Sequence, residues 1–235
     1  LSIENCKQAF DDLISRYSIL RTSFTNSFGD QTLQIVHKNV ESNFSYQKME
    51  KNDSETIEKY IERIKTEDKA QGFNFEQPAL MRLKIIEVER NKYVFIWSYH
   101  HILMDGWCMS ILINDFSTIL SAISTNEDAA LPVALKYSEY IKWLSKVNKE
   151  ASLEYWKKYL NGLENVIDLP FKKKTKSGTN FEIKHFKVNI EGALYQDVMR
   201  YCQETGVTLN VFVQGVWGYL LSRYNNAQDS VFGAV

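Results

Sequence analysis

Net charge is almost absent from this chain, because 28 Lys and Arg residues stand against 29 Asp and Glu residues and leave a formal charge of −1. This balance excludes the strong field by which basic proteins bind nucleic acid or anionic membranes. No run of about 18 apolar residues and no signal segment is visible, so neither a membrane span nor export is predicted. Cys6, Cys108 and Cys202 lack the paired spacing of metal sites or disulfide frameworks, which favours a reducing cytoplasm.

Apolar residues are plentiful enough to build a sizeable core, with 44% hydrophobic and 13% aromatic residues. Helical and strand periods alternate along the chain, which is typical of the α+β class. An apolar stripe from Ile3 to Leu20 predicts a helix that Ser2 could cap. The next expected elements are a hairpin of strands 20–28 and 31–36 around Gly29 and Asp30, an amphipathic helix over residues 54–69, and a hairpin of strands 80–87 and 93–99.

The second half of the chain is predicted to be mainly helical, with a change of composition in its middle. The stretch 170–180 is basic and poor in apolar residues, so we interpret it as a linker and its Lys172–Lys174 run as a solvated tract. The predicted organisation is an N-terminal lobe of residues 1–169, this linker, and the start of a C-terminal lobe over residues 181–235. The expected elements are helices over 137–147 and 153–160, a strand over 181–190, and helices over 194–204 and from Thr208 to Tyr224.

The most informative stretch is His100-His101-Ile102-Leu103-Met104-Asp105-Gly106. It follows the alternating strand pattern of residues 93–99 and precedes apolar residues at helical spacing, so it occupies a strand-to-helix turn. Such turns hold functional side chains on a rigid support. An imidazole there can accept a proton from an amine or hydroxyl. Gly106 offers a position without a side chain, where a substrate can approach the backbone.

Two simpler interpretations of the histidine pair stay open. Adjacent histidines can cap a strand without any catalytic role, one of them buried and hydrogen-bonded and the other in solvent. Alternatively, His101 and Asp105 could both ligate a metal ion, although no third ligand lies nearby in the sequence.

Three further stretches accompany the histidine motif in order along the chain. Residues 16–24 read Arg-Tyr-Ser-Ile-Leu-Arg-Thr-Ser-Phe, residues 137–143 read Tyr-Ser-Glu-Tyr-Ile-Lys-Trp, and residues 208–233 form a helix-and-strand pattern. Together the four stretches resemble the motifs of condensation domains of non-ribosomal peptide synthetases, within the chloramphenicol acetyltransferase-like superfamily. The first departs from the family pattern Arg-His-Glu-x-Leu-Arg-Thr-x-Phe, because Tyr17 and Ser18 stand where the family has His and Glu.

The resemblance implies a chloramphenicol acetyltransferase-like fold of two similar lobes, each a mixed sheet with flanking helices, with the histidine motif at the cleft between them. That fold needs roughly twice this length. The chain is therefore expected to be a fragment of a larger synthetase, incomplete at both ends and inactive alone.

The implied reaction is peptide-bond formation between an upstream acyl or peptidyl thioester and a downstream aminoacyl thioester. By resemblance, His101 is the general base or holds the attacking amine. No directly bound cofactor is expected, because both substrates ride on phosphopantetheine arms of carrier proteins. The expected partners are the upstream donor and downstream acceptor carrier proteins and an adjacent adenylation domain, without nucleic acid or membrane.

The other motif residues are expected to support the site. Asp105 should be structural, with Arg16 or Arg21 as its buried partner. His100 is expected to pack and to form hydrogen bonds. Gly106 and Trp107 are candidates for lining a substrate channel, although Trp107, like Trp143, is expected mainly in the core.

Three alternative functions remain at this point. An epimerisation domain shares the histidine motif but typically departs from the sequence after Asp105, where this chain keeps Gly106 and Trp107. A coenzyme A-dependent acyltransferase of the same superfamily is the second. The third is a non-catalytic docking module, against which the intact His101 argues.

Overall fold

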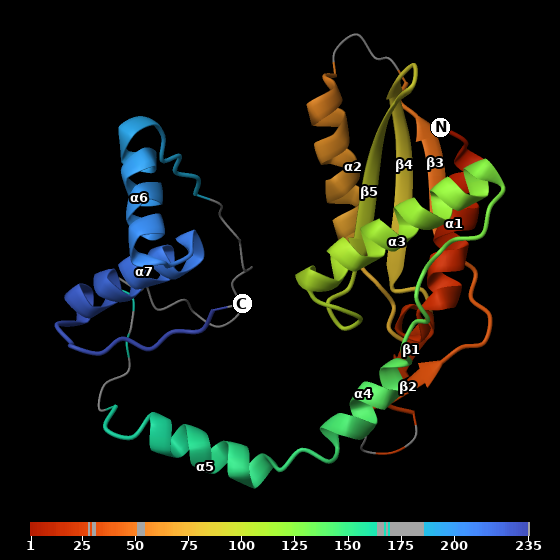
Figure 1. Ribbon diagram of the computed structural model, residues 1–235. Coiled ribbons are helices and arrows are strands. Elements are labelled where there is room, and N and C mark those ends of the chain that lie inside the picture. Colours follow the sequence, from red (N-terminus) through yellow and green to blue (C-terminus); the bar gives the residue numbers. More distant parts are fainter. Residues whose placement is uncertain are drawn as a thin grey trace. The chain divides into compact units, whose positions relative to one another are not determined.

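The computed structural model describes residues 1–27, 29, 32–50, 55–163, 167, 169 and 186–234. The chain divides into two compact units, Leu1–Val147 and Asn148–Val235. The first unit holds every strand assigned in the described residues together with α1 to α4, and the second holds α5 to α7 (Figure 1). The expected linker over residues 170–180 lies outside the described residues.

A three-stranded sheet forms the centre of the first unit. Strand β4 (Met81–Glu89) lies in the middle, paired in parallel with β3 (Asn43–Lys48) and antiparallel with β5 (Lys92–Tyr99). The expected hairpin of strands 80–87 and 93–99 is therefore confirmed. Strand β3 was not predicted, although its apolar Phe44 and Tyr46 alternate with polar residues in the manner of a half-buried strand.

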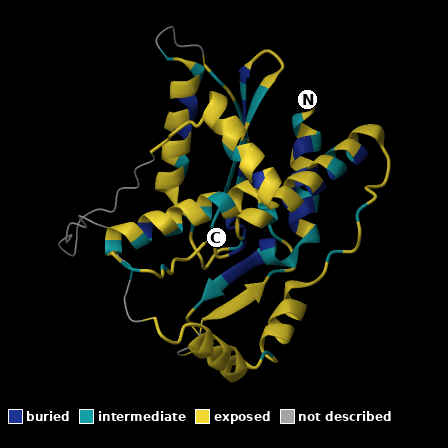
Figure 2. Ribbon diagram, turned by 60° about the vertical axis from the view of Figure 1, so that its left-hand side comes forward, coloured by how far each residue is buried: buried dark blue, intermediate teal, exposed yellow. Residues whose placement is uncertain are grey.

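Helices cover both faces of this sheet because β4 is apolar on both sides. Its odd positions, such as Leu83 and Ile85, pack against α1 (Ile3–Arg16) and α3 (Gly106–Thr125). Its even positions Ile86 and Val88 pack instead against α2 (Ile57–Gln71). Figure 2 shows the buried positions gathered where these helices meet the strands. The sheet thus separates two apolar cores, as expected for strands buried on both faces.

Side-chain caps fix the starts of the two outer helices. The Ser2 hydroxyl accepts a hydrogen bond from the Asn5 N–H at the start of α1, as the sequence predicted. Thr56 caps α2 in the same way, so this helix begins three residues later than expected. It ends at Gly72, whose φ of +60° lies in the region that favours glycine.

The predicted first hairpin is shorter than expected. A 3₁₀ turn, η1 (Ser18–Arg21), precedes strand β1 (Thr22–Thr25), which pairs antiparallel with β2 (Leu33–Val36). The Thr22 hydroxyl donates to the Ile19 carbonyl and closes this turn. The chain therefore bends at the positions where a strand was predicted to begin.

Helix α3 meets the length and composition requirements of a membrane-crossing helix, which the sequence analysis did not find. However, its residues Leu112, Phe116 and Ile119 are buried in the core against the sheet. A core helix of a globular unit meets the same requirements, and α3 packs as one.

Four helices follow α3 in the described residues: α4 (Tyr137–Leu144) in the first unit, and α5 (Lys149–Tyr159), α6 (Gly192–Thr205) and α7 (Leu209–Asn225) in the second. All four were predicted, and Thr208 caps α7 as expected. The expected strand over 181–190 is not found in residues 186–190, and its other residues lie outside the described part of the chain. Residues 231–233, expected to resemble a strand, form none.

Candidate functional site

The histidine motif forms a short turn between β5 and α3. Strand β5 ends at Tyr99 and α3 begins at Gly106. Within the turn, Leu103 and Met104 are buried at 5% and 8% exposure and fasten it to the core. The expected strand-to-helix placement is confirmed, and the polar residues of the motif lie on either side of this apolar anchor.

His100 is held by contacts on every side. Its backbone N–H donates to the Leu80 carbonyl, and its ring lies edge-on to Phe75 with 4.6 Å between ring centroids. Its Nδ1 accepts a hydrogen bond from the Ile102 N–H at 3.1 Å. In the neutral ring the proton therefore resides on Nε2. His100 closes the turn and orients the residues that follow it.

His101 is exposed, in contrast to its half-buried neighbour. Its ring centroid lies 5.7 Å from that of Tyr99, in an edge-on contact that leaves the imidazole accessible. Beside it, a Cβ added to Gly106 would meet no heavy atom within 4 Å. The space around His101 and the start of α3 is therefore open in the first unit.

The expectation that Trp107 and Trp143 belong to the core is wrong. Trp107 is 77% exposed and Trp143 is 60% exposed. Ile102 and Ile111 flank the turn and are also exposed, at 41% and 55%. The turn and the start of α3 thus carry several exposed apolar side chains. Exposed apolar surface is typical of ligand or partner sites where such side chains gather.

The expected ion pair of Asp105 with Arg16 or Arg21 is also wrong. Asp105 is exposed and is the N-cap of α3, where its Oδ1 accepts hydrogen bonds from the N–H groups of Trp107 (3.0 Å) and Cys108 (3.2 Å). The Cys108 thiol donates to the same oxygen at 3.3 Å. These hydrogen bonds, the thiol's first, hold the pKa of Asp105 below its usual value. A helix N-terminus stabilises a carboxylate by itself, so Asp105 needs no arginine.

Both arginines bind other groups. Arg21 donates a hydrogen bond to the His37 carbonyl. The Arg16 Nε donates to Asp115 Oδ2 at 3.0 Å, and the Tyr17 hydroxyl donates to the same oxygen at 2.7 Å. Arg16 also donates to the Pro132 carbonyl. Asp115 was not predicted as the partner of Arg16. Its carboxylate stands within the apolar pattern of α3, and a charged residue in such a position indicates a buried ion pair.

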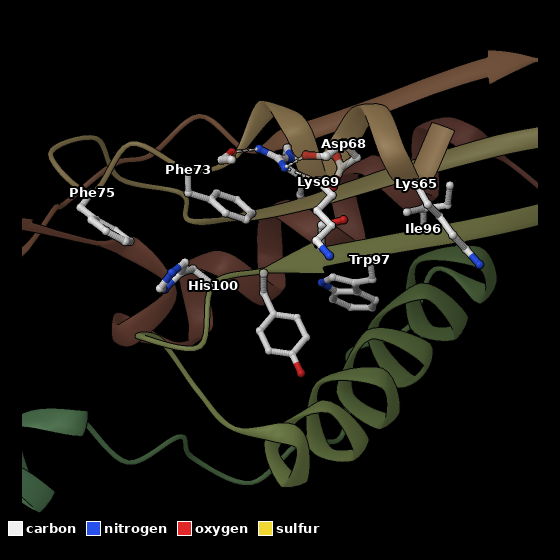
Figure 3. Close-up of a pocket in the computed structure, with 12 residues that line it drawn as sticks. Lys65, Asp68, Lys69, Phe73, Phe75, Ile96, Trp97 and His100 are labelled. Carbon is white, nitrogen blue, oxygen red and sulfur yellow. Dashed lines mark hydrogen bonds and ion pairs between the residues drawn. The ribbon is translucent and has the colours of Figure 1, made fainter. Parts of the chain in front are cut away.

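A pocket of about 540 Å³ lies beside the turn, between β5 and the C-terminal end of α2. Figure 3 shows His100 beside Phe73 and Phe75 in this pocket, with Trp97 and Ile96 further along its wall. Asp68 of α2 accepts hydrogen bonds from both Nε and Nη2 of Arg82 on β4, at 2.9 and 3.1 Å. The side chains of this pair are only 10% and 13% exposed, so it forms a rigid polar wall. The sequence analysis did not predict it.

No cluster of three potential metal ligands occurs among the described residues. Three donors already bind Oδ1 of Asp105, so only Oδ2 is left for a metal ion, and the described residues add no third ligand to His101 and Asp105. The His101 imidazole is exposed in this arrangement.

Comparison with known proteins agrees with the motifs. A family model described as condensation domain matches residues 1–235. The chain belongs to the condensation domain family. Among its relatives is gramicidin S synthase 2 of Brevibacillus brevis, which is 34% identical over 235 residues. The match covers all of this chain and 5% of that synthase, so this condensation domain sequence spans a small part of its relative's length.

Solved structures show the same fold as this condensation domain. The X-domain in a complex with OxyB from teicoplanin biosynthesis has a TM-score of 0.65 at 18% identity, covering 95% of this chain and 50% of that one. The epimerization domain from the third module of tyrocidine synthetase B has a TM-score of 0.59 at 19% identity, covering 71% of this chain and 38% of that one. The expected chloramphenicol acetyltransferase-like α+β fold is thereby confirmed.

Proposed function

We propose that this condensation domain forms peptide bonds in non-ribosomal peptide synthesis, with His101 at the reacting amine. The observation that carries the proposal is the contrast within the histidine pair. His100 is fixed by Phe75, Leu80 and Ile102, whereas the His101 imidazole is exposed on a rigid turn. Such an arrangement provides one free imidazole at a defined position.

In the proposed reaction, the amine of a downstream aminoacyl thioester attacks the carbonyl carbon of an upstream acyl or peptidyl thioester. A C–N bond forms, the C–S bond breaks, and the thiol leaves with one proton while the chain passes to the acceptor. His101 accepts the proton of the amine or holds the amine and stabilises its developing charge. General-base assistance contributes about 10²–10⁴-fold, and alignment of two tethered substrates contributes about 7–11 kcal/mol to lowering the barrier.

The remaining motif residues receive supporting roles in this proposal. His100 holds the turn in shape and Asp105 starts α3, which together fix the direction of His101. Gly106 leaves space for the substrate, and Trp107 lines the approach to it. Arg16 and Arg21 belong to the scaffold, because neither contacts the turn.

The substrates are proposed to arrive on phosphopantetheine arms of an upstream and a downstream carrier protein, beside an adenylation domain, in the cytoplasm. The relationship to gramicidin S synthase 2 supports this context. Exposed Ile102, Trp107 and Ile111 provide an apolar surface that a pantetheine arm and its acyl group can cover.

Epimerisation is the second candidate, and the shared fold with the epimerization domain of tyrocidine synthetase B favours it. Retention of Gly106 and Trp107 after Asp105 favours condensation. The two activities differ in product, because epimerisation inverts an α-carbon on one carrier and leaves the acceptor unloaded.

The deciding experiment loads donor and acceptor carriers and follows transfer in the synthetase that contains this domain. Wild type should place the dipeptidyl chain on the acceptor, and His101→Ala should lower the transfer rate by at least 10²-fold. Ile113→Ala, a change to an exposed apolar side chain of α3 to which the proposed reaction gives no role, is the matched control and should keep the histidine chemistry. Circular dichroism should be the same for all three proteins.

Other outcomes assign another function. Inversion of the donor residue without transfer would establish epimerisation, and acceptance of free acyl-coenzyme A in place of the loaded donor would establish a stand-alone type of acyltransferase. Transfer by His101→Ala at the wild-type rate would remove His101 from the chemistry. If the wild-type protein binds the carriers but catalyses no reaction, the domain is a non-catalytic docking module.

A further inference from the structure

A second pocket of about 720 Å³ lies in the first unit, away from the histidine turn. Residues of η1, β1 and β2 form one side of it, and α4 with the segment leading into it forms the other. It shares no lining residue with the pocket beside His100. The proposed peptide-bond chemistry assigns it no role.

The lining carries four basic side chains and no acidic one. Two of the four form ion pairs with carboxylates that do not line the pocket. Arg16 pairs with Asp115 at 3.0 Å, and Lys142 pairs with Glu139 at 2.8 Å. Arg21 and Lys136 form no ion pair with any described residue. Glu139 also interacts electrostatically with Lys136, so the charge that is left without a carboxylate partner in the lining is mainly that of Arg21.

Arg21 is the most informative of these residues. It is half-buried, its Nη1 donates to the His37 carbonyl, and its Nε is buried without a hydrogen-bond partner. A guanidinium has five donors in a fixed plane and readily binds carboxylate or phosphate oxygens. Buried donors are almost always satisfied. The Nε atom is itself closed off from solvent, so an anion in the pocket would meet the terminal nitrogens of the guanidinium and supply its missing countercharge.

The rest of the lining combines uncharged polar side chains, such as Thr22 and Gln34, with apolar ones. Ile19 and Val36 contribute from the strand side, and Leu135 and Ile141 contribute from the α4 side. Leu135 is 88% exposed and Ile141 is 43% exposed, so both have apolar surface left to cover. Burial of that surface favours a ligand with a hydrocarbon portion over a bare inorganic ion.

We infer that this pocket binds a small amphipathic anion, that is, a carboxylate or a phosphate monoester attached to an apolar chain. The anionic group contacts Arg21, and the chain lies against Val36, Leu135 and Ile141. This site is independent of the histidine turn and of the proposed peptide-bond formation.

Calorimetric titration of the purified protein with four probes tests both halves of the site. Octanoate and octyl phosphate carry charge and chain, octanamide lacks the charge, and acetate lacks the chain. We expect the two complete probes to bind at least tenfold more tightly than either incomplete one. Affinity for the complete probes should fall as salt rises, since screening weakens partly exposed charge pairs. The ratio between octanoate and octyl phosphate identifies which anionic group the site prefers.

Two kinds of variant locate the binding. Arg21→Gln should weaken octanoate binding at least tenfold, while Arg21→Lys, which retains the charge, should weaken it less. Ile141→Glu places a carboxylate on the exposed side of the pocket and should abolish binding even if Arg21→Gln fails to fold. Ile113→Glu is the matched control, because Ile113 is 50% exposed on α3 and outside this lining.

The inference is overturned by either of two results. One is the same affinity of wild type for octanoate and octanamide. The other is octanoate binding that Ile141→Glu leaves at the wild-type level or that Ile113→Glu reduces equally.

Discussion

Tyr17 gives the sharpest test of the packing in the first unit. Its hydroxyl donates to the buried Asp115 at 2.7 Å. Tyr17→Phe removes this donor but keeps the ring and its contact with the Arg16 guanidinium, 5.4 Å from the ring centroid. The variant thus isolates one hydrogen bond to a charged group.

The expected cost follows from the surroundings of Asp115, whose side chain is 8% exposed. Hydrogen bonds to charged groups contribute about 1.5–3 kcal/mol. In Tyr17→Phe, Arg16 still donates to the carboxylate, and Tyr17 is only half-buried. We therefore expect a loss of unfolding free energy at the lower end of this range, about 1.5 kcal/mol. In a protein of this size that loss corresponds to a decrease in Tm of about 3–6 °C.

The same contact predicts a pH dependence. Burial, and then the hydrogen bond to Asp115, raise the pKa of the Tyr17 phenol above its ordinary value. A raised folded-state pKa stabilises the protein below the unfolded pKa of about 10, and the contribution disappears as pH rises through the folded value. The difference in unfolding free energy between wild type and Tyr17→Phe should therefore be constant from pH 7 to 9 and shrink above pH 10.

Urea unfolding at several pH values measures both effects. Tyr219→Phe is the control, because Tyr219 is 68% exposed and its hydroxyl makes no hydrogen bond to a described residue. A double-mutant cycle with Asp115→Asn should give a coupling energy of about 1 kcal/mol or more. If Tyr17→Phe unfolds within about 0.3 kcal/mol of wild type at pH 7, the hydrogen bond does not stabilise the fold as argued.

Three further changes probe other parts of the chain. Asp68→Asn breaks the pair with Arg82 and should cost about 3 kcal/mol in urea unfolding. Burial raises the pKa of Asp68, but the hydrogen bonds from Arg82 more than offset this and lower it, so the wild-type pair should lose its contribution only as pH falls below about 4. Asp105→Ala removes the cap of α3 and should lower Tm by roughly 2–4 °C, whereas Asp105→Asn keeps a hydrogen-bond acceptor and should lower Tm less. If both variants lower Tm equally, the negative charge of Asp105, and not its hydrogen bonds, stabilises the helix start. Thr208→Ala should cost about 1 kcal/mol through the start of α7, and Thr208→Ser should restore most of it; no change in thermal unfolding would contradict the capping role.

The elements that the sequence predicted well are those with strong local periodicity. Strands β4 and β5 and helix α3 have apolar residues at regular spacing, and the structure forms all three. Strand β3 was missed because it has only Phe44 and Tyr46 as alternating apolar residues, and its partner β4 lies more than 30 residues further along the chain. Pairing over such a distance leaves little trace in a short window.

The site was predicted in its location but not in its contacts. The position of the histidine turn followed from the strand and helix patterns around it. The partner of Asp105 did not, because Trp107 and Cys108, directly after the motif, supply its hydrogen bonds. Such a local cap orders fewer residues than an ion pair with a distant arginine would. The exposure of Trp107 also eluded prediction, since residue type indicates only an average tendency to be buried.

Strand β4 belongs to both cores at once, and this has a consequence for chimeric proteins. Its even positions Arg82, Ile86 and Val88 face α2, and its odd positions Leu83 and Ile85 face α1 and α3. A segment grafted in place of α2 from a related domain therefore has to match the even positions of β4 and the neighbouring Val94 and Ile96 of β5, but not the odd positions of β4. The layer that carries the histidine turn can be inherited unchanged from the other parent.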